Sequence, residues 1–285
     1  TKEYYINDYG NQIINFTKSV YLRIREIKYN EKFIDEKDLY PGEYIKEIAE
    51  KILNKSKLKF HSFDESLNFL ENESLIYSMN MIKADLAKLG ITHDSFVSEK
   101  SIVSSNTVTN AIDKLKKNNY IEEGYLEPPK GEEKKNWKKT KRLIFKSVLF
   151  GDDSNRALQK DDGTWTYFAN DLAYHFNKVS RKYDKLINIL GADHTGYVKR
   201  IEGAVQALSE NKTSLECKVC QLVKLFKNGL PFKMSKRAGD FISVSDLLNE
   251  VNKDSIRFMM LNRSNDVELE FDFDKVLEKT KENPV

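Results

Sequence analysis

Hydrophobic residues recur along the first part of the chain at the three- and four-residue spacing of amphipathic helices. One series covers 13–24, a second covers 45–53 after a break at Pro41-Gly42, and a third covers 67–86 and ends at Gly90. Residues at this spacing share one face of a helix, so three or four helices are predicted here. An aromatic and β-branched run at Glu3–Ile6 precedes them and predicts a short strand.

Shorter apolar runs surround one more helical pattern in the middle of the chain. Strands are predicted at 96–97 and 120–126, with a helix between them that carries Val108, Ile112 and Leu115 on one face. The run 127–141 combines a Pro-Pro pair with many Lys and Glu residues, which predicts an exposed loop.

The second half of the chain alternates strand and helix patterns. A helix is predicted over 167–183, a buried strand over 186–190, a second helix over 195–208 and a longer strand over 215–226. Because strands separated by helices usually form parallel sheets with crossovers, an α/β fold is predicted. The pattern ends with a loop at 227–240 and helices at 243–251, 254–261 and 274–282.

The composition limits the classes of protein to consider. With 285 residues and 40% hydrophobic side chains, the chain can bury a sizeable core. No apolar run approaches the roughly 18 residues of a membrane helix, so no membrane association is expected. Two Cys residues exclude a disulfide scaffold and favour a reducing, cytoplasmic setting. The net charge of +3 is too small to indicate nucleic-acid binding, and only 9 of the 47 basic residues are Arg, so each Arg merits attention.

Two common chemistries have no support in the sequence. Neither a P-loop nor a dinucleotide-binding glycine motif occurs. The pair Cys217 and Cys220 lies within a strand pattern, where residues three apart point to opposite faces, so a structural role and no metal site is predicted. His61, His93 and His175 are scattered and are interpreted as surface or core residues.

The run Gly191-Ala192-Asp193-His194 directly follows the predicted strand at 186–190. Ligands of open parallel sheets bind at the carboxyl ends of the strands, so these residues are candidates for an anionic ligand. The alternative is that Asp193 simply caps the following helix.

The most specific run is Lys233-Met234-Ser235-Lys236-Arg237, which lies in a Gly- and Lys-rich loop before a helix with a Ser243-x-x-Asp246 start. Two lysines three residues apart on such a loop can offset the charge that develops on reacting phosphates. The alternative is a solvated basic loop.

This pentapeptide resembles the second signature of class I aminoacyl-tRNA synthetases. The runs at 151–153, 162–169, 191–198 and 233–240 resemble arginyl-tRNA synthetases in order and spacing, as does 4–12 near the chain start. The resemblance implies ATP-dependent ligation of L-arginine to tRNA through arginyl-adenylate, with Mg²⁺ accompanying ATP, in an enzyme expected to be monomeric.

The resemblance also assigns residues to the two substrates. Lys233 and Lys236, with Ser235, would stabilise the pyrophosphate leaving group. Gly191, Asp193, His194 and Met234 would lie near ATP, while Tyr167 and Asp171, with His194, would bind arginine. The last assignment also follows from the residues themselves. Positions 167 and 171 share a helix face, and a carboxylate beside an aromatic ring suits a guanidinium. The alternative makes Asp171 a first-turn helix acid.

The chain departs from the family in lacking the first signature, H-x-G-H, which the resemblance would place before Thr1. The resemblance implies a Rossmann-like sheet that is truncated at its N-terminal strand, with a mostly helical α+β insertion. The implied domains are an incomplete catalytic domain at 1–40 and 142–242, an insertion at 41–141, and a helical segment at 243–285 before an anticodon-binding domain. The chain alone is then expected to be inactive. A catalytically inactive nucleic-acid-binding module, or another class I synthetase or nucleotidyltransferase, is the alternative.

Overall fold

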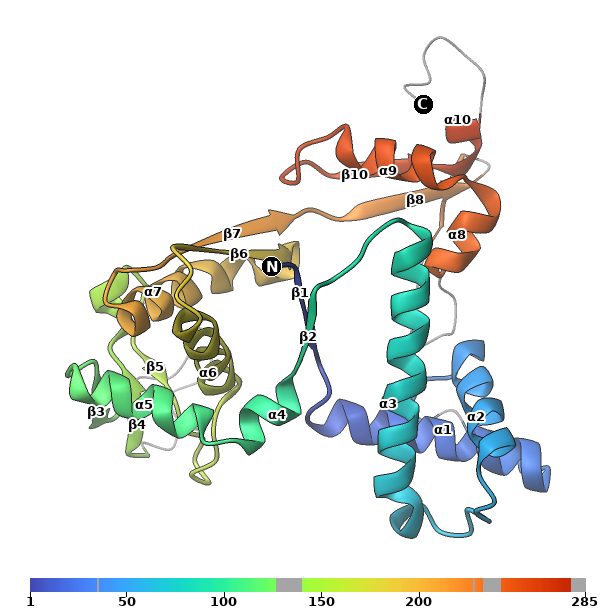
Figure 1. The fold of residues 1–285 in the computed structure, drawn as a ribbon, viewed down its shortest axis with the longest axis horizontal. Helices are drawn as coiled ribbons and strands as arrows, with labels where there is room; N and C mark the ends of the chain where they lie inside the picture. Colours follow the sequence, from blue (N-terminus) through green and yellow to red (C-terminus); the bar gives the residue numbers. More distant parts are fainter. Residues whose placement is uncertain (35, 127–139, 228, 233–241, 278–285) are drawn as a thin grey trace, which may run out of the picture. The chain divides into compact units, whose positions relative to one another are not determined.

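The computed structural model describes residues 1–34, 36–126, 140–227, 229–232 and 242–277. These residues fold into two compact units, which we describe one at a time (Figure 1). Unit 1 comprises Thr1–Phe96, Val223–Ser264 and Glu268–Val285, and unit 2 comprises Val97–Leu222 and Asn265–Val267. The mixed α/β class predicted from the sequence is confirmed, and the described residues include parallel strand pairs.

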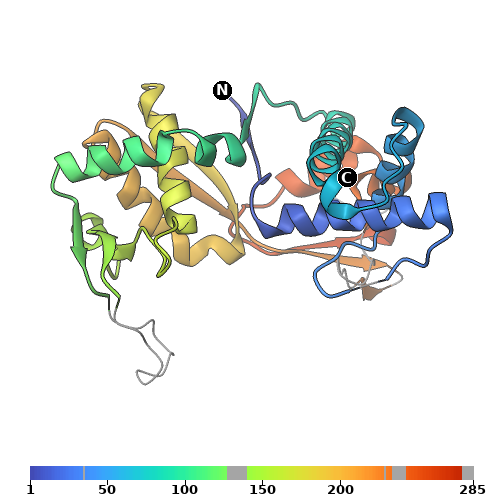
Figure 2. The same cartoon turned by 90° about the horizontal axis from the view of Figure 1, so that it is seen from below.

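The first part of unit 1 is built from three helices, α1 (Asn11–Tyr29), α2 (Glu43–Lys55) and α3 (Phe63–Lys88). Figures 1 and 2 show them packed together. In α1 and α2 the buried apolar residues are those of the predicted series. Helix α3 is uninterrupted, but it buries only Leu70 of its predicted series, together with Ser66, Glu73 and Ser74. Strand β1 (Glu3–Ile6) has the predicted bounds and pairs with β2 (Ser95–Ser98), within which the chain passes from unit 1 to unit 2.

The second part of unit 1 is a three-stranded sheet with short helices. Strand β8 (Val223–Lys227) pairs in parallel with β10 (Leu269–Asp272) and antiparallel with β9 (Leu230–Phe232). Helices α8 (Val244–Glu250), α9 (Lys253–Leu261) and α10 (Phe273–Leu277) accompany it. The predicted start of α8 is confirmed, because Ser243 and Asp246 form a reciprocal capping box.

Unit 2 begins with α4 (Glu99–Ser104), α5 (Thr107–Lys117) and an antiparallel sheet of β3 (Ile121–Gly124), β4 (Arg142–Phe145) and β5 (Arg156–Ala157). A 3₁₀ turn, η2 (Ser147–Phe150), follows β4. Helix α6 (Tyr167–Ser180) then leads into the parallel pair of β6 (Lys185–Gly191) and β7 (Ser214–Cys220). The crossover between these strands runs through a 3₁₀ turn, η3 (Ala192–Tyr197), and helix α7 (Val198–Ser209), as the strand–helix alternation predicts.

Several sequence predictions were wrong. The strand predicted over 215–226 is interrupted at Gln221 and Leu222, and its halves, β7 and β8, belong to different sheets. The backbone amide of Gln221 donates to the carbonyl of Asn265 at 2.8 Å, which ends the ladder with β6. The second half of β8 then pairs with β9, inside the predicted loop.

The strand predicted as buried over 186–190 is buried on one face only. Leu186 is 7% exposed, whereas Ile187 and Ile189 are 57% and 67% exposed. Apolar composition does not reveal which face of a strand is covered, and here one face of β6 is open within the described residues. The helix predicted from position 195 starts at Val198, because the preceding residues form η3.

The predicted division into 1–40 with 142–242, 41–141, and 243–285 stays a prediction, since a compact unit and a family domain are different groupings. Among the described residues, no helix is long and apolar enough to cross a membrane.

Candidate functional site

Helix α6 presents the two residues predicted to bind arginine. Its N-cap is Thr166, whose hydroxyl accepts a hydrogen bond from the Ala169 amide at 3.3 Å and donates to the Ala157 carbonyl at 3.0 Å. The helix therefore starts at Tyr167, and Asp171 follows one turn later. Tyr167 is 76% exposed, so its ring is available to a ligand. Asp171 lies beyond the first turn, which excludes the alternative of a first-turn helix acid.

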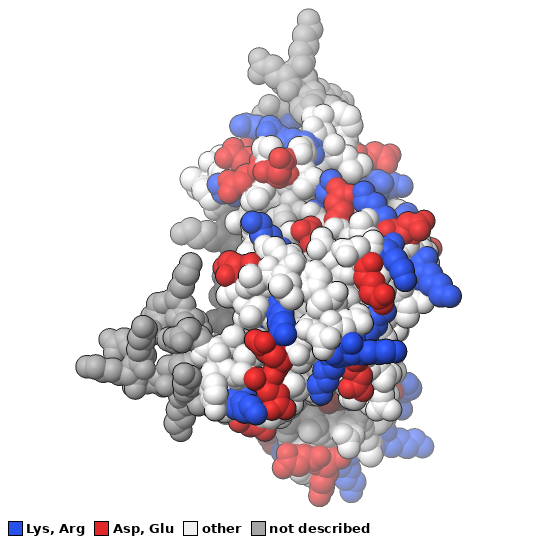
Figure 3. Space-filling view, turned by 90° about the vertical axis from the view of Figure 1, so that its left-hand side faces the viewer, with Lys and Arg blue, Asp and Glu red and all other residues white. Residues whose placement is uncertain are grey.

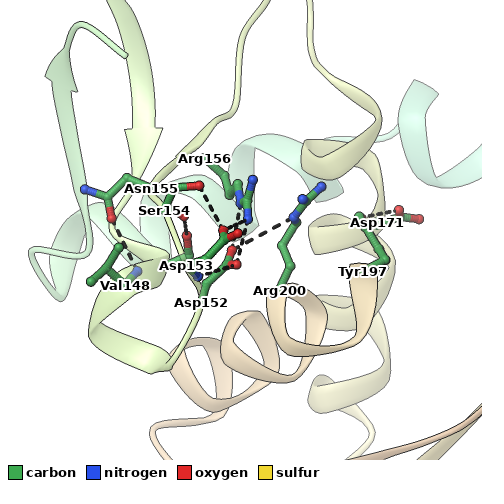
Figure 4. Close-up of polar contacts among 10 residues, drawn as sticks. Val148, Asp152, Asp153, Ser154, Asn155, Arg156, Asp171, Tyr197 and Arg200 are labelled. Atoms are coloured by element: carbon green, nitrogen blue, oxygen red, sulfur yellow. Dashed lines mark hydrogen bonds and ion pairs between the residues drawn. The ribbon is translucent and has the colours of Figure 1, made fainter. Parts of the chain in front are cut away.

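The Asp171 carboxylate is held by a tyrosine from the crossover. Tyr197, the last residue of η3, donates its hydroxyl to Asp171 Oδ2 at 2.6 Å (Figure 4). Burial raises the pKa of Asp171, although the Tyr197 hydroxyl, His194 and Lys178 each act to lower it. No Lys or Arg side chain of the described residues forms an ion pair with this carboxylate. A desolvated carboxylate of this kind gains most from a ligand that brings its own positive charge.

A chain of hydrogen bonds fixes the backbone of α6 behind Asp171. Lys178 Nζ donates to Asn188 Oδ1 at 2.7 Å, so the Asn188 amide nitrogen is directed at His175 Nε2, 2.9 Å away. His175 Nδ1 then carries the proton and donates to the Asp171 carbonyl at 2.7 Å. His175 is 4% exposed, as expected for a core histidine. This series of hydrogen bonds links α6 to β6 at the helical turn that carries Asp171.

Three of the four predicted ATP-binding residues lie at the carboxyl end of β6, as expected for a ligand site of a parallel sheet. Gly191 ends the strand, and Asp193 and His194 follow within η3 with their side chains 82% and 53% exposed. The two side chains approach each other at 3.6 Å, between His194 Nε2 and Asp193 Oδ2. Asp193 is inside η3 and makes no capping hydrogen bond, so the helix-cap alternative is wrong. Through Tyr197, η3 connects this group to Asp171.

The remaining predicted residues, Lys233, Met234, Ser235 and Lys236, lie outside the described residues. Their assignments stay predictions.

A cluster of charged residues beside Tyr197 was not predicted from the sequence. Asp152 accepts two hydrogen bonds from Arg156, at 2.7 Å from both Nε and Nη2. Arg200 Nε lies 3.9 Å from Asp152 Oδ2 (Figure 4). Although burial acts to raise it, the hydrogen bonds and charge of Arg156, with further donors, lower the pKa of Asp152 to about 2. The scarcity of Arg in so Lys-rich a chain was the available signal, since two of the 9 Arg residues meet here.

Other parts of the described structure do not contribute to the site. A polar hollow of about 280 Å³ lies at the start of β7, at the opposite end of the strand pair from Gly191. Burial raises the pKa of the Cys217 thiol to about 11, so it is not a reactive thiolate. The described residues hold no cluster of three or more potential metal ligands. The face seen in Figure 3 carries acidic and basic side chains intermixed.

Comparison with known proteins identifies relatives over the whole chain. It is 58% identical to an arginine–tRNA ligase of Pelagibacter ubique and 48% identical to one of Ruegeria pomeroyi, with the entire chain aligned in both cases. A Campylobacter jejuni protein described as an arginyl-tRNA synthetase has the same fold, with a TM-score of 0.83 and 33% identity over 99% of this chain and 58% of the other. No family model matches.

The alignment covers only part of each of these relatives. The chain spans about half the length of the curated relatives it matches. Over its full length, in sequence and in fold, the chain is similar to arginyl-tRNA synthetases.

Proposed function

We propose that this chain takes part, within a longer enzyme, in the ATP-dependent ligation of L-arginine to tRNA. In this reaction the arginine carboxylate attacks the α-phosphorus of ATP, giving arginyl-adenylate and pyrophosphate. A hydroxyl of the terminal tRNA ribose then attacks the adenylate carbonyl and releases AMP. The names of the relatives support the reaction, and the geometry around Asp171 supports the choice of amino acid.

The observation that carries the proposal is the half-buried Asp171 carboxylate, one helical turn after Tyr167 with its exposed ring. A guanidinium would supply the missing positive charge, donate paired hydrogen bonds and stack on the ring. Lysine carries the charge but not the planar donor fork, so it should be a poor substitute. His194 is proposed to contribute at the edge of the site, since it acts to lower the pKa of the Asp171 carboxyl.

The other roles follow the sequence assignment. Gly191, Asp193, His194 and Met234 are proposed to lie near ATP at the carboxyl end of β6, where exposed polar groups support the assignment. Lys233 and Lys236, with Ser235, are proposed to stabilise the departing pyrophosphate. Mg²⁺ is proposed to enter bound to the phosphates of ATP, and no step depends on protein ligands to it. The same proposal includes the truncated Rossmann-like sheet and the predicted domains. It also includes a monomeric state and a cytoplasmic location.

The first prediction tests the amino-acid site in the complete enzyme, with tRNA present. The wild-type enzyme should catalyse arginine-dependent ATP–pyrophosphate exchange. In Asp171→Asn, arginine binding should weaken by about 2–5 kcal/mol, the range for breaking a buried charge pair. Arginine affinity and a melting curve are measured for each variant. Tyr167→Ala should weaken arginine less, because it removes a stacking surface and not a charge.

The matched control is Asp184→Asn, which removes an exposed carboxylate of unit 2 outside the site. It should leave arginine affinity unchanged. Normal arginine affinity in a folded Asp171→Asn enzyme would show that the guanidinium is bound elsewhere.

A further inference from the structure

Arg200 occupies an unusual position in the first turn of α7. Its Nε is buried and has no hydrogen-bond partner among the described residues. The nearest carboxylate oxygen, Asp152 Oδ2, is 3.9 Å from Nε, which is too far for a hydrogen bond. An unpaired buried donor costs free energy, so the position of Arg200 calls for an explanation beyond simple ion pairing.

Asp152 does not need Arg200 for compensation. Arg156 already donates to both of its carboxylate oxygens at 2.7 Å, in the bidentate geometry of a strong pair. The second arginine is therefore attracted to Asp152 without being bound tightly by it. Figure 4 shows Arg200 between this carboxylate and the Tyr197–Asp171 pair.

The other contact of Arg200 is with the ring of Tyr197. The guanidinium carbon lies 5.0 Å from the ring centroid, a distance at which a cation is attracted to an aromatic face. Phe168 meets the same ring edge-on, with centroids 6.3 Å apart. Held by the guanidinium and by Phe168, the ring has little freedom to turn. Its hydroxyl is thereby directed at Asp171 Oδ2, 2.6 Å away.

We infer that Arg200 is a positioning residue for arginine recognition: attracted by the charge of Asp152, it fixes the ring of Tyr197 and, through the tyrosine hydroxyl, the carboxylate of Asp171. This inference rests on the proposed function. Arg200 does not touch Asp171 in this arrangement, so its effect on arginine must pass through Tyr197. Loss of Arg200 should therefore change arginine binding, while ATP binding and the chemical step should change little.

The experiment is a double-mutant cycle in the complete enzyme with tRNA present. Wild type, Arg200→Ala, Tyr197→Phe and the double variant are compared in arginine-dependent ATP–pyrophosphate exchange, with KM for arginine, KM for ATP and kcat measured separately. Tyr197→Phe loses one hydrogen bond to a charged group and should raise KM for arginine about 10- to 100-fold. Arg200→Ala should raise it about fivefold, the size of a cation–ring contact.

The double variant decides the question. If Arg200 acts through Tyr197, the double variant should match Tyr197→Phe, and KM for ATP should stay within about twofold throughout. Lys199→Ala, which removes an exposed charge next to Arg200 on the same helix, should behave as wild type. Arg200→Lys keeps the charge without the planar group and should be intermediate. If Arg200→Ala does not fold, KM for arginine is measured in Arg200→Lys instead.

Several outcomes would overturn the inference. These are multiplicative effects in the double variant, an unchanged KM for arginine in Arg200→Ala or, if that variant does not fold, in Arg200→Lys, or an effect confined to ATP. If the wild-type enzyme shows no arginine-dependent exchange, both the proposed function and this inference are rejected. Exchange by the wild type with any of the other outcomes overturns the role of Arg200 alone.

Discussion

Asp171 shows how a side chain can be costly for the folded chain and useful for a ligand. Burial raises its pKa, and among the described residues a neutral hydroxyl is its closest hydrogen-bonding partner. The sequence was sufficient to predict that Tyr167 and Asp171 share a helix face, because that needs only local spacing. It could not predict Tyr197, which lies 26 residues further along and reaches Asp171 only through the packing of the crossover.

The raised pKa of Asp171 leads to a prediction about pH. A carboxyl whose pKa is higher in the folded chain binds protons more readily there than in the unfolded chain. Its contribution to stability is thus largest below the unfolded pKa of about 3.9, and is lost as the pH rises through the folded value. Asp171→Asn cannot ionise and should melt a few degrees higher than wild type near neutral pH, with little gain at acid pH.

Melting curves of the two proteins across this pH range make the test, with Asp184→Asn as an exposed control that should show no such trend. A melting difference for Asp171→Asn that is the same at neutral and at acid pH would contradict the assigned direction. Arginine affinity should show the opposite trend and rise with pH, because the guanidinium binds the ionised carboxylate.

Among the elements, the contact of α7 with η2 determines how the crossover sits. A Cβ at Gly203 would lie 2.9 Å from Phe150 Cβ and 3.1 Å from the Phe150 carbonyl oxygen, so only glycine allows this approach. The same contact brings the first turn of α7, with Arg200, close to the loop that carries Asp152. A glycine in a helix centre is thus explained by packing.

Gly203→Ala tests this contact. The clash should cost about 1–3 kcal/mol, and the better helix propensity of alanine should return about 1 kcal/mol, so a net loss of stability is expected. Gly196→Ala is the matched control, since no atom lies within 4 Å of the added Cβ. Thermal melting of both variants provides the measurement. An equal or higher melting temperature for Gly203→Ala would mean that η2 moves away at no cost.

The elements with strong periodicity were predicted well, and those that depend on partners were not. Helices α1, α2 and α5 bury the residues that their apolar series indicate. The alternation at 215–226 is real, but nothing in that run shows that the chain changes sheets at Gln221. That change depends on Asn265, which is distant in sequence. Strand β9 is short and gains its identity only from pairing with β8.

At the scale of the whole molecule, the chain passes repeatedly between the two units. Unit 2 takes up Asn265–Val267, although the residues on either side belong to unit 1. Asn265 is fastened to the end of β7 by two hydrogen bonds. Its side-chain Nδ2 donates to the Val219 carbonyl at 2.7 Å, and its own carbonyl accepts from the Gln221 amide at 2.8 Å. These bonds replace the ladder where β7 stops.

Asn265→Ala removes the side-chain hydrogen bond and should cost about 1 kcal/mol. The effect should be local, so amide hydrogen exchange at the end of β7 should accelerate more than exchange in α1 or α2 of unit 1. The control is Asn262→Ala, at an exposed position whose side chain makes no hydrogen bond in the described structure. It should change neither the stability nor the hydrogen exchange at the end of β7. Uniform acceleration in both units would show that Asn265 contributes to global stability and not to a local fastening.

The position of Asn265–Val267 also bears on how the protein emerges from the ribosome. Synthesis delivers Val97–Leu222 first, then all of Val223–Ser264, and only then the three residues that complete unit 2. The nascent unit 2 must wait with the end of β7 unpaired on that side, while a segment that folds elsewhere is being made. Exposed strand ends of this kind can pair with other chains and cause aggregation. The speed of translation through Val223–Ser264 therefore determines how long the nascent protein is prone to aggregate.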